Sequence, residues 1–256
     1  MKVSTKDNWE AFWEEKSELE EVYANSERIR ENLSQVMDIS GKKILEVGAG
    51  TGRDSFYMAK DGATLVCLDY SMNSLKIMRK ALPDPNVVSV VGGDAFKLPF
   101  PDGSFDVVFH QGLLEHFRHA EADALLRENI RILRKGGLIV VDVPQRWHIY
   151  TVIKHILIAL NAWFAGWERE FSVREVRNIL AGMGMTFRHA YGEWMYPSLF
   201  YRMFREAGRK IGLKLPLYPV IFPPVRSLRS KIRKNMDGTW LKLNTALSIG
   251  IIAEKQ

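Results

Sequence analysis

The sequence predicts an α/β protein with a doubly wound, mostly parallel sheet. Short apolar runs alternate along the chain with segments of helical periodicity, and the first of these runs ends in a glycine-rich turn. The chain has 256 residues, of which 46% are hydrophobic and 26% charged, which is ordinary for a globular protein. This length allows one large domain with a well-buried core.

The first run and its turn read ILEVGAGTGRDS, from Ile44 to Ser55. They predict a buried strand, a tight turn and the start of a helix. Gly48, Gly50 and Gly52 place no Cβ in the turn, so backbone N–H groups can approach a ligand closely. The partly positive start of the following helix faces the same place. We therefore expect a nucleotide-like cofactor there.

The spacing of the glycines narrows the choice of cofactor. A dinucleotide fingerprint, G-x-G-x-x-G, would need a glycine where Arg53 stands. Glu46 precedes the first glycine by two positions, so the turn resembles motif I of the class I S-adenosylmethionine-dependent methyltransferases, E/D-x-G-x-G-x-G. Further blocks follow in the order of that family, and together they span Lys43 to Pro144. The resemblance implies S-adenosyl-L-methionine as the cofactor.

Acidic residues follow the next two predicted strands. Asp69 ends the run ATLVCLD, 21 positions after Gly48, where a carboxylate can accept both ribose hydroxyls. In the resemblance, Asp94 and Ala95 lie beside the adenine and Phe96 frames the ring. The resemblance implies a cofactor site made of Glu46, Gly48, Ala49, Gly50, Gly52, Asp69, Tyr70, Asp94, Ala95, Phe96, His110 and Gln111.

Histidines after the fourth and fifth predicted strands are the candidates for a general base. Methyl transfer from a sulfonium is an in-line displacement, so a base is needed only if the acceptor must lose a proton. Glu115 and His116 follow the fourth strand, and this pair resembles one in the small-molecule, methyltransferase type 11-like branch of the family. We predict His116 as the catalytic residue and His148 as the second candidate. A structural hydrogen bond is the alternative use of each histidine.

The resemblance also implies how the chain is divided. A Rossmann-like core of seven strands, in the order 3-2-1-4-5-7-6, is expected from residues 41–194 and 240–256. Residues 1–40 are expected to form a helical segment over the cofactor, in which Tyr23 and Arg28 are candidates to meet its carboxylate. Residues 145–170 and 195–239 are expected to form a cap over the acceptor site.

The two parts of this cap differ in character. Residues 147–167 are almost continuously apolar and predict a helix that packs on the core or faces an apolar substrate, with one side made of Ile149, Val152, Ile153, Ile156, Leu157 and Leu160. Residues 195–238 carry ten basic and two acidic residues, although the net charge of the whole chain is only +6. This surplus predicts a solvated face, or a surface for anionic lipid headgroups or an acidic substrate; nucleic acid is the least favoured partner.

Cysteine use and missing motifs limit the alternatives. Cys67 is the only cysteine, so the chain can form no intramolecular disulfide and no cysteine metal cage, and no H-E-x-x-H pattern occurs; we predict no metal site. With the lack of an apolar leader, this favours a cytoplasmic protein. The sequence predicts a methyltransferase for a small, apolar or amphipathic acceptor. An RNA or protein methyltransferase that uses the basic insertion, and a catalytically inactive cofactor-binding partner protein, stay open as alternatives.

Overall fold

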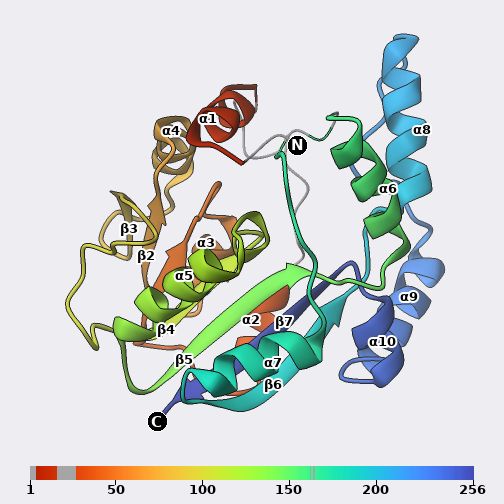
Figure 1. Cartoon of the computed structure of the whole chain (residues 1–256). Coiled ribbons are helices and arrows are strands. Elements are labelled where there is room, and N and C mark those ends of the chain that lie inside the picture. The colour runs from red at the N-terminus through yellow and green to blue at the C-terminus, as the bar shows by residue number, and fades with distance from the viewer. Residues whose placement is uncertain (1–3, 16–26, 162, 164) are drawn as a thin grey trace.

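A seven-stranded sheet in the order β3-β2-β1-β4-β5-β7-β6 forms the centre of the protein (Figure 1), as the sequence predicted. The computed structural model describes residues 4–15, 27–161, 163 and 165–256, so the candidate Tyr23 lies outside the described residues. Only β7 runs antiparallel to its neighbours β5 and β6. The strands are β1 (Lys43–Val47), β2 (Thr64–Asp69), β3 (Val88–Gly92), β4 (Phe105–Gln111), β5 (Leu133–Pro144), β6 (Met185–Glu193) and β7 (Ser248–Lys255).

Helices cover both faces of the sheet and extend beyond one end of it (Figure 1). The described helices are α1 (Lys6–Glu15), α2 (Arg28–Leu33), α3 (Arg53–Lys60), α4 (Met72–Ala81), α5 (His119–Arg131), α6 (Ile149–Ala159), α7 (Val173–Gly182), α8 (Leu199–Lys210), α9 (Pro223–Asn235) and α10 (Trp240–Thr245). A short 3-10 turn, η2 (Leu114–His116), follows β4.

The core consists of two apolar layers, one on each face of the sheet. In β1, Leu45 and Val47 pack with residues of α5 and α7, whereas Ile44 packs with residues of α2, α3 and α4. Strands buried on both faces read as continuous apolar runs, which explains why the sequence pattern identified them. The carboxyl ends of β1, β2 and β4 meet where the strand order reverses, the place where doubly wound sheets bind ligands.

The cap consists of α6, α8, α9 and α10, which stand beside the end of the sheet (Figure 1). The prediction that the apolar side of α6 is buried was wrong, because Ile149, Val152, Ile156 and Leu160 are 74%, 61%, 55% and 69% exposed. The buried residues of this helix are Lys154 and Ile158. None of the helices in the described ranges is both long and apolar enough to cross a bilayer.

Candidate functional site

The glycine-rich turn after β1 needs glycine for two reasons. Its backbone has positive φ angles, and a neighbouring side chain lies close to it. Gly48, Gly50 and Gly52 have φ angles of 66°, 55° and 67°, in the left-handed region that side chains disfavour. A Cβ on Gly50 would lie 2.7 Å from a ring carbon of Trp13, which α1 brings against the turn. The turn therefore accepts close contact from the N-terminal helix, and α3 begins directly after it.

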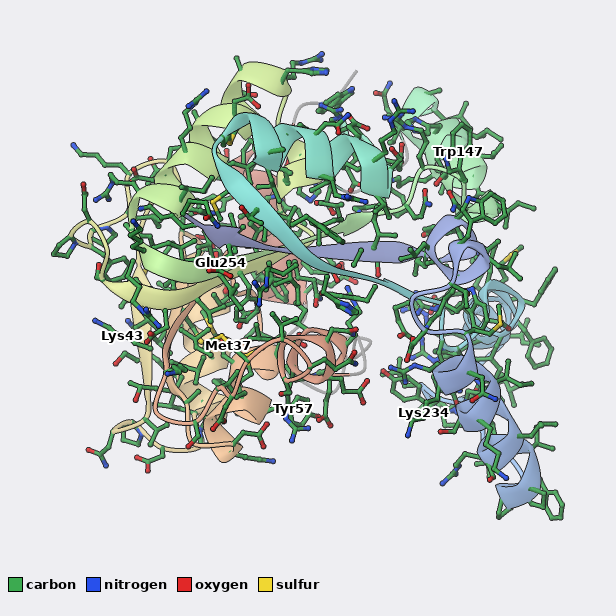
Figure 2. The ribbon with its side chains drawn as sticks, turned by 90° about the horizontal axis from the view of Figure 1, so that it is seen from below. Met37, Lys43, Tyr57, Trp147, Lys234 and Glu254 are labelled. Atoms are coloured by element: carbon green, nitrogen blue, oxygen red, sulfur yellow. The ribbon has the colours of Figure 1, made fainter. Side chains whose placement is uncertain are left out.

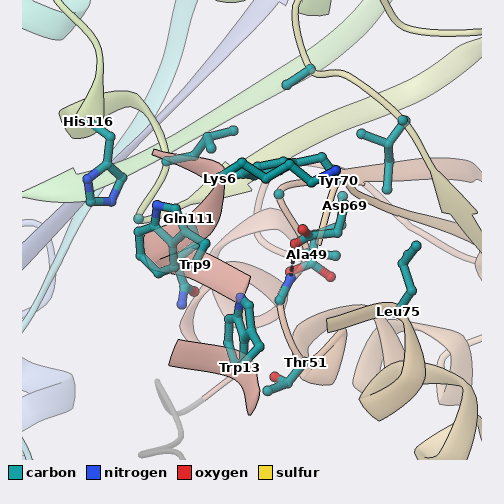
Figure 3. A pocket seen from close by; sticks show the side chains of 18 of the residues that line it. Lys6, Trp9, Trp13, Ala49, Thr51, Asp69, Tyr70, Leu75, Gln111 and His116 are labelled. Atoms are coloured by element: carbon teal, nitrogen blue, oxygen red, sulfur yellow. Dashed lines mark hydrogen bonds between the residues drawn. The ribbon is translucent and has the colours of Figure 1, made fainter. Parts of the chain in front are cut away.

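A cavity of about 960 Å³ opens at this turn, between α1 and the ends of β1, β2 and β4. Figure 3 shows Trp9 and Trp13 of α1 beside the cavity that Asp69 and Tyr70 also line. Ten of the twelve residues predicted to bind the cofactor line this cavity: Glu46, Gly48, Ala49, Gly50, Asp69, Tyr70, Asp94, Ala95, Phe96 and Gln111.

The two remaining predicted residues lie away from the lining. Gly52 is the N-cap residue of α3, and a Cβ on it would lie 3.1 Å from Met78 and from Phe56. His110 is fully buried in β4, and neither ring nitrogen has a hydrogen-bond partner among the described residues. Burial lowers the pKa of His110 to about 4, so the ring is neutral at physiological pH. The next residue, Gln111, faces the cavity instead, because successive side chains of a strand point to opposite sides.

Asp69 holds the turn and the start of the next helix together. The backbone N–H of Gly50 donates to one oxygen of the Asp69 carboxylate over 2.8 Å, and that of Ser71 donates to the other over 2.9 Å. Burial raises the pKa of Asp69, and these backbone donors oppose that shift. Each carboxylate oxygen has a second lone pair, so both can also accept a hydroxyl from a ligand.

Asp94 is placed more loosely at the end of β3. Its carboxylate accepts the backbone N–H of Phe96 over 2.9 Å and is otherwise exposed. The Phe96 ring packs edge-on against Phe117, with 4.9 Å between ring centroids. This loop therefore presents an acid and an aromatic edge on one wall of the cavity.

A buried pair of acids lines the opposite end of the same cavity. Glu46 accepts the Ser55 hydroxyl over 2.6 Å, and burial together with nearby Asp54 raises its pKa well above the usual range. Burial likewise raises the pKa of Asp54 to about 6. Two acids in one low-dielectric site favour an added positive charge, such as an ammonium group.

These groups fit S-adenosylmethionine. Asp69 offers two acceptors for ribose hydroxyls, Asp94 offers one for an amino group, and the Glu46–Asp54 pair suits the ammonium of the amino-acid end. Gln111 also lines the cavity, and its buried Oε1 has no hydrogen-bond partner in the described part of the chain. The volume lies in the range of small-molecule sites.

A second cavity, of about 520 Å³, adjoins the first on the cap side. Both cavities are lined by Trp9, Gln111, Gly112 and His116. The outer wall of the second cavity comes from the cap, through Tyr150 and Lys154 of α6, Arg202 of α8 and Tyr218.

His116 stands where the two cavities meet. Its ring packs edge-on against Trp9, with 5.0 Å between centroids, and its Nδ1 lies 3.8 Å from Oε1 of Glu168. Glu168 is fixed by Nζ of Lys154 and by Nε1 of Trp163, each at 2.7 Å. Burial lowers the pKa of His116, so its ring is neutral at pH 7 and able to take a proton.

His148, the second candidate base predicted from the sequence, does not lie at the junction of the two cavities. His148 precedes α6, and its Nδ1 accepts the backbone N–H of Tyr150 over 3.1 Å, which caps the helix. His148 is not among the described residues that line either cavity. Glu115, beside His116, is buried, and burial together with Glu168 raises its pKa to about 8.

Arg28, a candidate for the cofactor carboxylate, borders the second cavity and not the first. Its guanidinium donates to both oxygens of Asp142, over 2.8 and 2.7 Å, and Tyr191 donates its hydroxyl to the same carboxylate over 3.0 Å. Sequence reasoning missed this group, since Arg28 and Asp142 are 114 residues apart. It also missed Trp9 and Trp13, whose i, i+4 spacing on one helix face was the available signal.

The comparisons with known proteins agree with this geometry. Residues 45–141 match the family model of the methyltransferase domain. A demethylmenaquinone methyltransferase of Renibacterium salmoninarum is 37% identical over 40% of this chain and 41% of its own length. A fatty-acid O-methyltransferase of Mycolicibacterium smegmatis is 32% identical over 52% of this chain and 48% of its own length. The matches thus span about half, or less, of these curated relatives.

The fold is also found among solved structures. The crystal structure of an S-adenosylmethionine-dependent methyltransferase of Thermotoga maritima superposes with a TM-score of 0.63 and 19% identity, over 98% of this chain and 100% of that one. The segment that matches the family model, residues 45–141, contains most of β1, the glycine-rich turn, Asp69, Asp94 and most of β5. Residues 45–141 therefore match a methyltransferase domain, and the chain shares the fold of a solved S-adenosylmethionine-dependent methyltransferase.

Proposed function

We propose that the protein transfers a methyl group from S-adenosylmethionine in the first cavity to a small amphipathic acceptor in the second. The observation that carries this proposal is the junction of the two cavities at Trp9, Gln111, Gly112 and His116. S-adenosylmethionine supplies an already activated methyl group, so the protein has mainly to align the reactants and exclude water.

The residues of the first cavity would hold the cofactor from three sides. Asp69 and Asp94 would bind its adenosine, and Glu46 would lie towards its amino-acid end. Trp9 and Trp13 of α1 would cover it and keep water out. We thus assign α1, within the expected residues 1–40, to a cover over the cofactor, and residues 145–170 and 195–239 to the wall of the acceptor cavity.

His116 would accept the proton of an acceptor that must lose one. Its neutral ring can take a proton, and the nearby carboxylate of Glu168 would stabilise the imidazolium that forms. Lys154 holds Glu168 in place from α6, which couples the base to the cap. Because His148 caps α6 and lines neither cavity among the described residues, we propose His116 as the base.

The chemistry of the second cavity favours an amphipathic acceptor. Aromatic side chains form much of its lining, namely Tyr150, Trp163, Trp194, Tyr196 and Tyr218. Ionisable side chains such as Glu115 and Lys154 also line it. The names of two relatives, a demethylmenaquinone and a fatty-acid methyltransferase, support an acceptor with an apolar body and one polar group.

Calorimetry and methyl transfer test the proposal in two steps. We expect S-adenosylhomocysteine to bind with micromolar affinity and NAD not to bind. Labelled methyl transfer should then reach phenolic, quinol or carboxylic acceptors with apolar chains, and not RNA. Binding of NAD alone, or transfer to RNA alone, would overturn the proposal.

The role of His116 has its own test. His116→Gln should lower kcat by about a hundredfold or more, with little change in cofactor affinity. His119→Gln is the matched control, because His119 is exposed on α5 a few positions away. If His148→Gln caused the same loss as His116→Gln, the assignment of the base would be wrong.

A further inference from the structure

We infer that the outer faces of α6 and α8 form a docking surface for an anionic lipid bilayer. The surface consists of Ile149, Val152, Ile156 and Leu160 on α6, and Phe200, Met203 and Phe204 on α8. It is separate from the cofactor cavity, so its existence does not depend on the proposed methyl transfer.

The first observation is the orientation of α8. Helices of globular proteins normally turn their apolar face towards the core. On α8 the apolar side chains face solvent instead, since Phe200, Met203 and Phe204 are 82%, 59% and 61% exposed. The opposite face points inwards, where Arg202 donates to the carbonyls of Pro197 and Tyr196 over 3.0 Å each.

The same reversal occurs on α6. Tyr150, Thr151 and Lys154 line the second cavity from one side of this helix. Ile149, Val152 and Ile156 lie on the opposite side and are exposed. The two helices stand next to each other at one end of the protein (Figure 1), and both border the second cavity from their inner faces. Their exposed apolar rows therefore face away from the body of the protein.

The second observation is the charge of the segment that carries α8 and α9. Lys214, shortly after α8, and Lys231 and Lys234 on α9 are exposed and have no ion pair among the described residues. Figure 2 shows Lys234 on α9, a helix that projects clear of the sheet. The two acidic residues of segment 195–238 already form ion pairs. Glu206 pairs with Arg205 and Arg209 at 2.9 Å each, and Asp237 pairs with Lys242.

This combination fits a lipid surface. Aromatic and aliphatic side chains can enter the boundary between headgroups and acyl chains, while unpaired lysines bind anionic headgroups. A protein partner would need acids set opposite these lysines, whereas a bilayer adapts to any spacing of charges. Where the proposed function holds, the inner faces of the same helices would receive an acceptor that arrives from the bilayer.

Vesicle co-sedimentation tests the surface without any measurement of activity. The whole 256-residue chain is mixed with phosphatidylcholine vesicles, or with phosphatidylcholine vesicles that contain phosphatidylglycerol. We expect sedimentation with the second kind, and a decrease as salt is added. Phe200→Ser/Met203→Ser/Phe204→Ser should lower the partition coefficient about tenfold or more.

A charge variant keeps the test valid should the serine variant fail to fold. Lys214→Gln/Lys231→Gln/Lys234→Gln should lower the partition coefficient into anionic vesicles about tenfold or more. The control, Lys60→Gln/Lys76→Gln/Lys135→Gln, removes the same charge from exposed lysines outside the cap. It should sediment like the unchanged protein.

Three outcomes would overturn the inference. One is the absence of sedimentation with either vesicle, and another is equal losses in the two lysine variants. The third is a dimer in vesicle-free buffer, seen by light scattering, that the serine substitutions dissociate while vesicle binding is absent. That result would assign the apolar rows to a second copy of the chain.

Discussion

The two cavities are built by opposite means. Apart from residues of the N-terminal segment that carries α1, the first cavity, proposed for the cofactor, is lined by residues within 46–117, and its Asp69 and Asp94 carboxylates accept nearby backbone N–H groups. The acceptor cavity depends on side chains that come from segments as distant as Arg28, His116 and Arg202. Local backbone features leave a clear sequence pattern, whereas contacts between distant side chains leave almost none.

The two regions also differ in how their buried charges are stabilised. In the first cavity, the Asp69 carboxylate is stabilised by hydrogen bonds from backbone N–H groups. On the acceptor side, buried charges face each other directly, as in Arg28–Asp142 and Lys154–Glu168. Removing one partner of such a pair leaves the other charge buried and unpaired, which costs far more than losing an exposed pair.

The largest expected effect is therefore on stability. Arg28→Met should lower the free energy of unfolding by about 3–5 kcal/mol, because Asp142 would keep its buried charge without the guanidinium. Arg30→Met is the matched control, since Arg30 pairs with Asp61 from the same helix but is about a third exposed and should cost at most about 1 kcal/mol. Urea unfolding measures both values, and equal losses would contradict the contrast between the two regions.

A smaller effect is expected on cofactor affinity. Asp69→Ala should weaken the binding of S-adenosylhomocysteine about a hundredfold, because it removes both ligand acceptors and the bonds that hold the turn. Asp94→Ala should weaken it only about tenfold, since this exposed carboxylate anchors a single N–H. Calorimetry compares the two, and a larger loss for Asp94→Ala would reverse the roles proposed here.

The smallest effect concerns the cover of the cofactor cavity. The Glu10 carboxylate of α1 accepts the Ser71 hydroxyl over 2.9 Å and the N–H groups of Met72 and Asn73 over 2.7 and 3.2 Å, at the start of α4. Burial acts to raise the pKa of Glu10, but these donors outweigh it and lower the pKa. Glu10→Gln should weaken cofactor binding about fivefold.

Glu14→Gln provides the comparison on the same helix, because Glu14 is exposed. It should bind the cofactor as the unchanged protein does. A Glu10→Gln variant that binds equally well would show that α1 does not act through this contact.

Most of the fold could be predicted from the sequence. The glycine-rich turn and the acids at the strand ends are local patterns, and the resemblance supplied the strand order that the structure confirms. Within the core range 240–256, the structure places a short helix, α10, before the last strand, which begins at Ser248.

The acceptor side was predicted less well, for physical reasons. The apolar stretch after β5 did form a helix, but hydrophobicity does not reveal whether an apolar face meets the core or solvent. His148 looked like a base because of its place after a strand, where a helix cap was equally compatible with the sequence. The Lys154–Glu168 pair that supports His116 joins two residues of the cap whose proximity no local motif signals.

The contact of Glu10 with the start of α4 has a consequence for the timing of the reaction cycle. It fastens α1 across the cofactor cavity, while Trp9 on the same helix also borders the acceptor cavity. Where the proposed function holds, exchange of the spent cofactor would require α1 to lift, whereas the outer wall of the acceptor cavity belongs to the cap. We therefore expect an ordered cycle, in which the methylated product departs first and S-adenosylhomocysteine leaves last.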